Sequence, residues 1–198
     1  MATTSDFAIS NFKSNLAQGG ARPSLFSVEI LYPTHSNKIT QPAIKSKFLV
    51  KGASIPASTI GAYDVYYHGK AIKVAGDRTY DTWETTIIND EDYGHRIAIE
   101  QWMDLISNHI LNTRDKDFPL KEGENSSYKK NLKVTQFSKN GEELHHYHIQ
   151  GAFPTALSTI ALDWGTQEIE EYTCTWTYDR WMPGSVPLHG LSSERHPS

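Results

Sequence analysis

The fold is decided by the stretch from Val74 to Glu91, which reads VAGDRTYDTWETTIINDE. Its second half, residues 81–88, is rich in Thr, Trp and Ile, a composition typical of a β-strand. Asn89 or Asp90 is then expected to cap a helix, because short polar side chains accept hydrogen bonds from the first N–H groups of a helix. The acidic residues that follow suit the positive end of the helix dipole. This stretch therefore predicts a strand that leads directly into a helix.

The predicted helix carries one apolar stripe. Its large apolar side chains recur at positions i, i+3, i+4, i+7 and i+11, which are Ile99, Trp102, Met103, Ile106 and Ile110. At 3.6 residues per turn these side chains fall on one side of the helix. We expect this side to pack flat against a sheet.

Segments on both sides of this stretch have the patterns of strands and turns. Before it we predict two strands and a hairpin: 26–32, 47–51, and 60–67 with 70–74 around the turn His68-Gly69. After the helix we predict two strands around the turn Asn140-Gly141 and a final pair: 131–138, 144–150, a strand around Leu162, and 170–180. The predicted fold class is mainly β, an antiparallel β-sandwich or barrel with one flanking helix and a long hairpin.

Composition divides the chain into three parts. Residues 1–22 are rich in Ser, Asn, Gly and Ala, so an N-terminal arm is expected there. Residues 23–181 are expected to form the β domain, and the proline-containing segment 182–198 a C-terminal extension. Inside the domain, the polar stretch 112–127 has no periodicity, which predicts a long loop that is functional or disordered.

The charge and cysteine content disfavour several classes of protein. The chain has 198 residues, with 19 Lys and Arg against 23 Asp and Glu, and a formal net charge of −4. A negative molecule repels phosphate, so a general nucleic-acid clamp is not expected. Cys174 is the only cysteine, so no intramolecular disulfide can form, which fits assembly in a reducing cytosol. No signal peptide and no membrane insertion are expected, because no apolar run approaches the length that spans a bilayer.

Candidates for chemistry are few. His145, His146 and His148 could contribute to a metal site, but on a strand only His146 and His148 share a face, and no third ligand lies near in sequence. The carboxylates between Asp77 and Asp92 fit turns and the helix start better than acid–base catalysis. No phosphate-binding loop or nucleophile elbow occurs. We therefore expect no enzyme activity, no cofactor and no metal, and a metal enzyme built on the histidines is a distant alternative.

The last predicted strand has two unlike faces. One face is Glu170, Tyr172, Cys174, Trp176, Tyr178 and Arg180, and the other is Glu171, Thr173, Thr175, Thr177 and Asp179. The first predicts a core, where burial would raise the pKa of the Cys174 thiol and keep it unreactive. The second is threonine and acid throughout, and part of it recurs earlier as Thr82, Glu84 and Thr86. Taken alone, these faces describe an antiparallel sheet with one solvated side.

The motif Ala75-Gly76-Asp77-Arg78-Thr79, with Trp83 and the helix after it, resembles the tail tube proteins of contractile-tailed bacteriophages. These proteins are related to the inner tube proteins of type VI secretion systems and pyocins. Further matching pieces occur in the same order along the chain: 21–26, 128–130, 151–155, 162–164, 168–169 and 179–181. The long stretch 112–127 and the segment 182–198 depart from the compact members of the family.

The resemblance implies rings of six subunits that stack into a hollow tube. If each subunit lends four strands, a wall of about 24 strands with a tilt near 40° closes at a backbone diameter of roughly 48 Å. Side chains would leave an opening of roughly 35 to 40 Å, wide enough for duplex DNA to pass without specific binding. A wall lined with Lys and Arg would hold the DNA, so a threonine-rich acidic wall suits a conduit. We therefore expect the polar set from Glu171 to Asp179 to line the lumen, the alternative being that another strand pair does so.

The resemblance also implies partners. A contractile sheath would surround the tube, and a baseplate or tube initiator and a tail terminator would bind its ends. The protein would belong to the virion after assembly in the host cytoplasm. The hairpin, with Tyr63, Tyr66, Tyr67 and Lys70, is the candidate for ring-to-ring stacking, unless its aromatic side chains only cover the subunit's own core. The alternative function is the inner tube of a phage-derived injection system that moves protein effectors.

Overall fold

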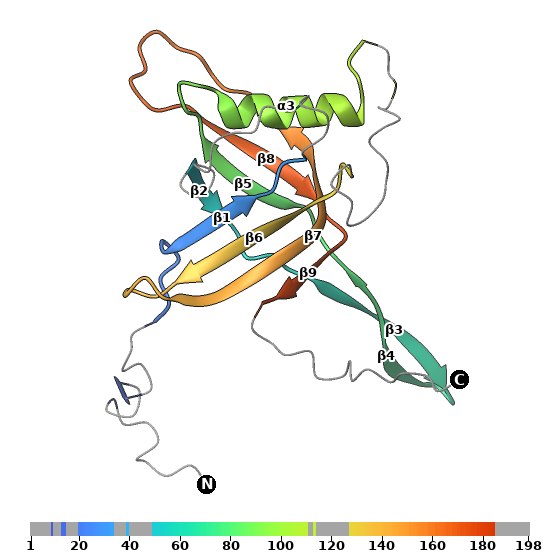
Figure 1. Cartoon of the computed structure of the whole chain (residues 1–198). Helices are drawn as coiled ribbons and strands as arrows, with labels where there is room; N and C mark the ends of the chain where they lie inside the picture. Colours follow the sequence, from blue (N-terminus) through green and yellow to red (C-terminus); the bar gives the residue numbers. More distant parts are fainter. Residues whose placement is uncertain are drawn as a thin grey trace, which may run out of the picture.

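The computed structural model describes residues 9, 13–14, 20–33, 39, 49–110, 113 and 127–184. The long helix α3 (Gly94–Ile106) accompanies a set of strands (Figure 1). The strands are β1 (Phe26–Ile30), β2 (Val50–Ala53), β3 (Thr59–Tyr67), β4 (Lys70–Thr79), β5 (Trp83–Ile88), β6 (Lys130–Phe137), β7 (Glu143–Leu157), β8 (Glu171–Thr177) and β9 (Arg180–Pro183). The fold is mainly β, as predicted.

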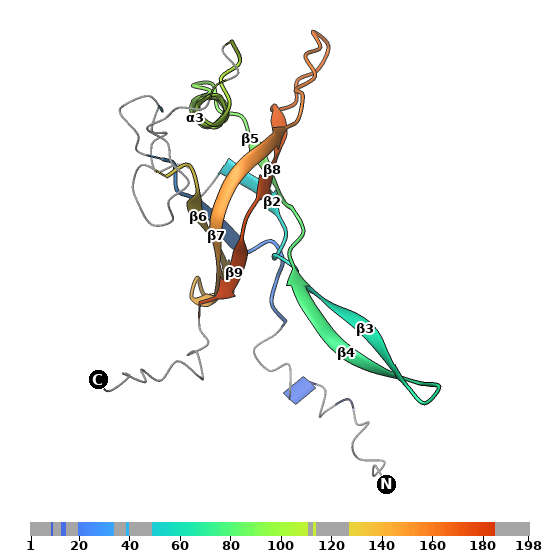
Figure 2. The ribbon, with the colours of Figure 1, turned by 90° about the vertical axis from the view of Figure 1, so that its right-hand side faces the viewer.

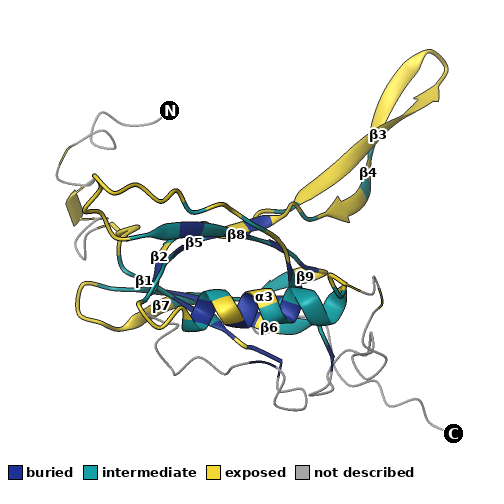
Figure 3. Cartoon of the chain, turned by 90° about the horizontal axis from the view of Figure 1, so that it is seen from above, coloured by how far each residue is buried: buried dark blue, intermediate teal, exposed yellow. Residues whose placement is uncertain are grey.

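Seven of the strands form one curled antiparallel sheet. Its order is β1-β6-β7-β8-β5-β2, and β9 pairs with β7 off this path. The 15-residue strand β7 joins the two halves: its first part pairs with β6 and β9, and its second part with β8. Gly151 lies at this change of partner with a φ of 68°, a left-handed conformation that favours glycine. Seen from above, the strands enclose the core between the two halves of the sheet (Figure 3).

The core is built from aromatic and branched side chains of both halves. The largest fully buried members are Trp83, Trp102, Trp176, Tyr172, Ile87, Ile99, Leu132, Ile149 and Val28. Alternation along β8 buries Tyr172, Cys174 and Trp176, as the sequence predicts. Trp102 of α3 contacts Trp176 with ring centroids 5.7 Å apart, and its indole N–H donates to the carbonyl of Tyr128. The helix therefore closes one end of the core, crossing the ends of the strands (Figure 1).

The start and end of α3 differ from the prediction. The helix begins after Tyr93, which has a φ of 51° and gives no side-chain cap, so the predicted cap at Asn89 or Asp90 is wrong. Asn89 instead donates its side-chain amide to Glu170, and Tyr93 donates its hydroxyl to the same carboxylate. Ile110 lies beyond the helix and is 90% exposed, so it does not belong to the apolar stripe.

Several strands also differ from the prediction. The strand predicted at 47–51 lies at β2, two to three residues later. The strand predicted around Leu162 is absent, and residues 158–170 form a loop instead. β7 continues through Pro154, and β9 includes Met182 and Pro183, which the sequence places in the C-terminal extension. The segment 112–127 lies outside the described residues except at its positions 113 and 127.

The hairpin β3–β4 forms a separate two-stranded sheet that projects away from the curled sheet (Figures 1 and 2). It turns at His68-Gly69, as predicted, with positive φ at both residues. Every residue of β3 is exposed. The hairpin therefore lies outside the core of its own subunit.

Candidate functional site

The first candidate surface is the polar face of β5 and β8, here called the threonine face. Strand register pairs Glu84 with Thr175, Thr86 with Thr173, and Ile88 with Glu171. The intervening pairs, Thr85–Cys174 and Ile87–Tyr172, are buried in the core. Since paired residues of antiparallel strands share a face, these polar side chains line one continuous surface. The structure thus brings together Glu171, Thr173, Thr175 and Thr177 with the earlier strand's Glu84 and Thr86.

Hydroxyl groups on this surface bond to the backbone and to each other. Thr155 of β7 donates to the carbonyl of Thr175 at 3.1 Å, and the Thr177 hydroxyl lies 3.4 Å from that of Thr155. The backbone N–H of Thr173 donates to the Ser158 hydroxyl at 2.8 Å. These bonds extend the threonine face to Thr155 of β7 and to Ser158, which follows the end of that strand.

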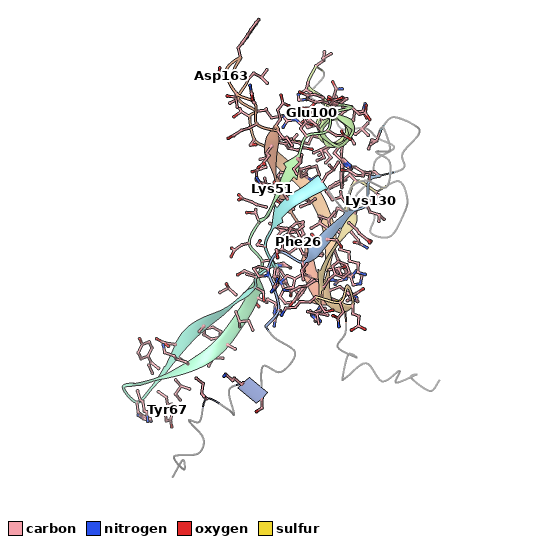
Figure 4. All side chains as sticks on the ribbon, turned by 90° about the vertical axis from the view of Figure 1, so that its left-hand side faces the viewer. Phe26, Lys51, Tyr67, Glu100, Lys130 and Asp163 are labelled. Carbon is pink, nitrogen blue, oxygen red and sulfur yellow. The ribbon has the colours of Figure 1, made fainter. Side chains whose placement is uncertain are left out.

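The charges of the threonine face largely cancel. Lys51 of β2 forms an ion pair of 2.5 Å with Glu171 (Lys51 is labelled in Figure 4). Glu84 is exposed on the same face. Asp179 lies beyond the end of β8, where its carboxylate accepts hydrogen bonds from Lys129 at 2.7 and 2.8 Å. The surface is therefore rich in hydroxyl groups and carries little net charge.

The second candidate surface is the hairpin, whose two faces differ. Register pairs Tyr63 with Val74, Val65 with Ile72, and Tyr67 with Lys70, so these residues share one face. We call this set the apolar hairpin face. The opposite face carries Tyr66 with Ala71, and Asp64 with Lys73 in an ion pair of 2.9 Å. Tyr63, Tyr67 and Lys70 thus lie together, whereas Tyr66 points to the other side.

Exposure of the apolar hairpin face is large. Tyr67 is 66% exposed, Tyr63 55% and Ile72 52%. The possibility that these aromatic side chains cover the subunit's own core is therefore wrong. Contiguous exposed apolar patches are typical of contact surfaces.

The sequence motif lies at the base of the hairpin. Ala75, Gly76, Asp77, Arg78 and Thr79 end β4, and Trp83 begins β5. Gly76 lies against Gly61, where a side chain would come within 3.3 Å of the Gly61 carbonyl oxygen. The Trp83 indole N–H donates to the Ser54 carbonyl at 2.7 Å. The motif therefore anchors the projecting hairpin to the curled sheet.

The remaining candidates for chemistry are the histidines of β7 and Cys174. His146 and His148 share a face with ring centroids 4.9 Å apart, and His145 contacts Tyr147. Among the described residues, no group of three or more His, Cys, Asp or Glu is placed to hold a metal ion. Cys174 is buried, and burial raises the pKa of its thiol.

The comparisons with known proteins identify the chain's family. Residues 21–183 match the family described as phage tail tube protein. The chain belongs to this family. The tail tube protein gp19 of Enterobacteria phage T4 is 30% identical over 166 residues, which cover 81% of this chain and 90% of that protein. The corresponding protein of phage T6 is 29% identical over the same length. The chain is therefore a tail tube protein, with a structural role in a tube.

Solved structures share the fold of this tail tube protein. The cap of the anti-feeding prophage aligns with a TM-score of 0.61 at 18% identity, covering 94% of this chain and all of that chain. A sheath–tube complex of an extracellular contractile injection system (PVC) aligns with a TM-score of 0.56 at 16% identity, with the same coverage. In the described part of the chain, no helix is both long enough and apolar enough to cross a membrane.

Sequence reasoning missed parts of both surfaces. The pairing of Lys51 with Glu171 joins residues 120 positions apart, and no local pattern indicates it. Thr155 carries no sequence signal because Pro154 is typical of a strand end, although β7 continues past it. Residues 158–169 form an exposed loop instead of a strand, with Trp164 fully exposed.

Proposed function

We propose that this protein is the subunit of the inner tube of a contractile phage tail, in which rings of six subunits stack into a conduit for DNA. A contractile sheath surrounds the tube, a baseplate or tube initiator binds one end and a terminator the other. The protein resides in the virion after assembly in the host cytoplasm. It performs no catalysis in this role.

The observation that carries this proposal is the threonine face. It lies on β5 and β8, in the middle of the strands β2-β5-β8-β7. Six such sets of four strands give a wall of about 24 strands and a backbone diameter of roughly 48 Å. With Glu171, Thr173, Thr175 and Thr177 facing inward, the wall presents hydroxyl groups and few cations. Duplex DNA would then pass without the counterion release that accompanies binding to Lys and Arg.

Ring and tube formation also accounts for the exposed strand edges and the hairpin. β1 and β2 are the edge strands of the curled sheet. Edge strands expose backbone groups that can pair with a strand of another chain. A contact between unlike surfaces that closes after six copies forms a ring. The hairpin, with Tyr63, Tyr66, Tyr67 and Lys70, then supplies contacts between rings.

The alternative is the inner tube of a contractile injection system that translocates protein effectors. The solved structures from such systems support it through the fold. The phage T4 and T6 relatives, which match at higher identity, favour the DNA conduit.

Negative-stain electron microscopy with light scattering over a concentration series tests the proposal. Purified protein is expected to form hollow six-fold rings or tubes, and preformed tubes should seed their growth. A protein that stays monomeric at every concentration, even with seeds, would contradict the proposed tube.

A further inference from the structure

A second exposed apolar element lies in the loop that joins β7 to β8. Leu162 is 79% exposed, Trp164 is fully exposed, and Ile169 is 71% exposed. We call residues 162–169 the tryptophan loop. Single exposed apolar residues are ordinary, but three large ones in eight residues indicate a contact surface.

The tryptophan loop has a defined turn that presents Trp164. The Asp163 carboxylate accepts a hydrogen bond from the Gly165 N–H at 2.9 Å, and the Asp163 carbonyl accepts one from the Thr166 N–H at 3.2 Å. Trp164 therefore lies at the second position of a closed four-residue turn. The turn constrains the backbone that carries the exposed Trp164 side chain, which lowers the backbone entropy lost when a partner binds.

The charges of the tryptophan loop and the hairpin are complementary. The loop holds Asp163 and Glu168 and no Lys or Arg. The end of the hairpin, residues 63–74, holds Lys70, Lys73 and one acid, Asp64, which pairs with Lys73. Lys70 lies beside Tyr67 on the apolar hairpin face. Each element therefore combines large apolar side chains with a charge of opposite sign to the other.

The two elements lie at opposite ends of the subunit. Figure 4 labels Tyr67 at the tip of the hairpin and Asp163 in the loop, and the curled sheet lies between them. Figures 1 and 2 show the same separation from other sides. The loop of a subunit therefore cannot cover its own hairpin. Two unlike surfaces at opposite ends of one molecule are the requirement for head-to-tail stacking, in which each copy binds the next in the same way.

We propose that the tryptophan loop of one subunit docks on the apolar hairpin face of a second copy in the next ring. The inference rests on the proposed tube and names the pair of surfaces that stack its rings. Trp164 packs against Tyr67 and Val65, and Glu168 lies near Lys70. Trp and Tyr are the side chains that most often dominate such interfaces.

Cross-linking tests the pairing directly. The one native thiol, Cys174, is buried, so an added surface cysteine is the reactive group. A Val65→Cys protein is mixed with a Gln167→Cys protein and treated with a short bis-maleimide. The matched control replaces Val65→Cys with Ala71→Cys, on the opposite face of the hairpin. The proposal predicts a cross-linked heterodimer with Val65→Cys and several-fold less of it with Ala71→Cys.

Assembly of two further variants separates the pairing from the tube itself. Trp164→Ala and Tyr67→Ala should each raise the protein concentration needed for tubes at least about tenfold. Gln167→Ala, in the same loop, should leave that concentration within about twofold. When the two variants are mixed, the intact Trp164 of the Tyr67→Ala protein can dock on the intact Tyr67 of the Trp164→Ala protein. The reverse contact lacks both side chains. Stacking should therefore stop at pairs, and no tubes should form.

The outcomes are distinct. Wild-type tubes together with no Val65–Gln167 cross-link, or with normal assembly of Trp164→Ala, would overturn the pairing and leave the tube function standing. Equal cross-linking of Val65→Cys and Ala71→Cys would also overturn it. If the wild-type protein forms no tubes while the cysteine variants give the face-specific cross-link, the tube function would be contradicted and the pairing supported.

Discussion

The indole N–H of Trp176 donates a hydrogen bond of 2.9 Å to the hydroxyl of Thr85, and both side chains are fully buried. Thr85 lies on β5 and Trp176 on β8, the two strands that carry the threonine face on their other side. The bond therefore fixes the pair of strands from within the core. A buried polar group of this kind is costly to leave without a partner.

Replacing Thr85 with Val should remove the acceptor while keeping the shape of the side chain. The buried indole N–H then has no partner, and the free energy of unfolding should fall by about 1–3 kcal/mol. Thr85→Ser keeps the hydroxyl and serves as the control, with a smaller loss from the missing methyl group. Urea unfolding followed by tryptophan fluorescence measures both. Equal stability of Thr85→Val and wild type would show that this bond contributes nothing.

Two glycines with positive φ separate backbone strain from steric overlap. Gly141 has a φ of 82° and open space where a Cβ would lie, whereas a Cβ at Gly151 would overlap the Asp179 carboxylate. Gly141→Ala should cost about 1 kcal/mol, the strain of a left-handed residue. Gly151→Ala should cost at least about 1 kcal/mol more, because Asp179 must move. If the two variants have the same unfolding midpoint in urea, the close approach of Asp179 has no energetic effect.

Much of the fold follows from local patterns, and the exceptions depend on distant partners. Alternation along β8 indicates that the face with Trp176 is buried. The turns at His68-Gly69 and Asn140-Gly141 indicate the positions of two hairpins. At the start of α3, Tyr93 donates a hydrogen bond to Glu170, which lies 77 positions away in the sequence. No sequence pattern near the helix start predicts that hydrogen bond.

The candidate surfaces are predictable to different extents. The threonine face is predictable on β8 because its period of two is uninterrupted. Its ion pair with Lys51 and its extension to Thr155 arise from pairing with other strands. The tryptophan loop lies where the sequence predicts a strand around Leu162, because exposed large apolar residues such as Leu162 and Trp164 cannot be told from core residues by sequence alone.

The stability of the protein should fall as the pH decreases below about 6.5. Burial, followed by the charges of His146 and Lys133, lowers the pKa of His148 from its ordinary 6.5, and Glu143 and Glu29 oppose this shift. The folded protein thus binds the His148 proton less tightly than the unfolded chain. The contribution of His148 is fully present above the unfolded pKa and is lost as the pH falls from there through the lower folded pKa.

Replacing His148 with Gln removes this proton-binding site. The variant's urea midpoint should decline less than that of the wild type between pH 7.5 and 5.5. An identical decline in both proteins would show that His148 does not contribute to the pH dependence.

The threonine face offers a test of the conduit. Thr175→Lys places one added cation per subunit on this face, and in a tube these cations repeat in every ring. Such tubes should bind short duplex DNA at low salt and release it as the salt concentration rises. Thr175→Gln, which adds bulk without charge, should bind DNA no better than wild type. Lysine-variant tubes with wild-type affinity for DNA would show that a cation on this face does not retain DNA, which would contradict the reason given for its lack of lysine and arginine.

A cryo-EM map of tubes grown from the purified protein tests the proposed conduit most directly. We predict six subunits per ring, with the side chains of Thr173 and Thr175 facing the central channel. A map in which these two side chains lie on the outer surface of the tube would contradict the proposal.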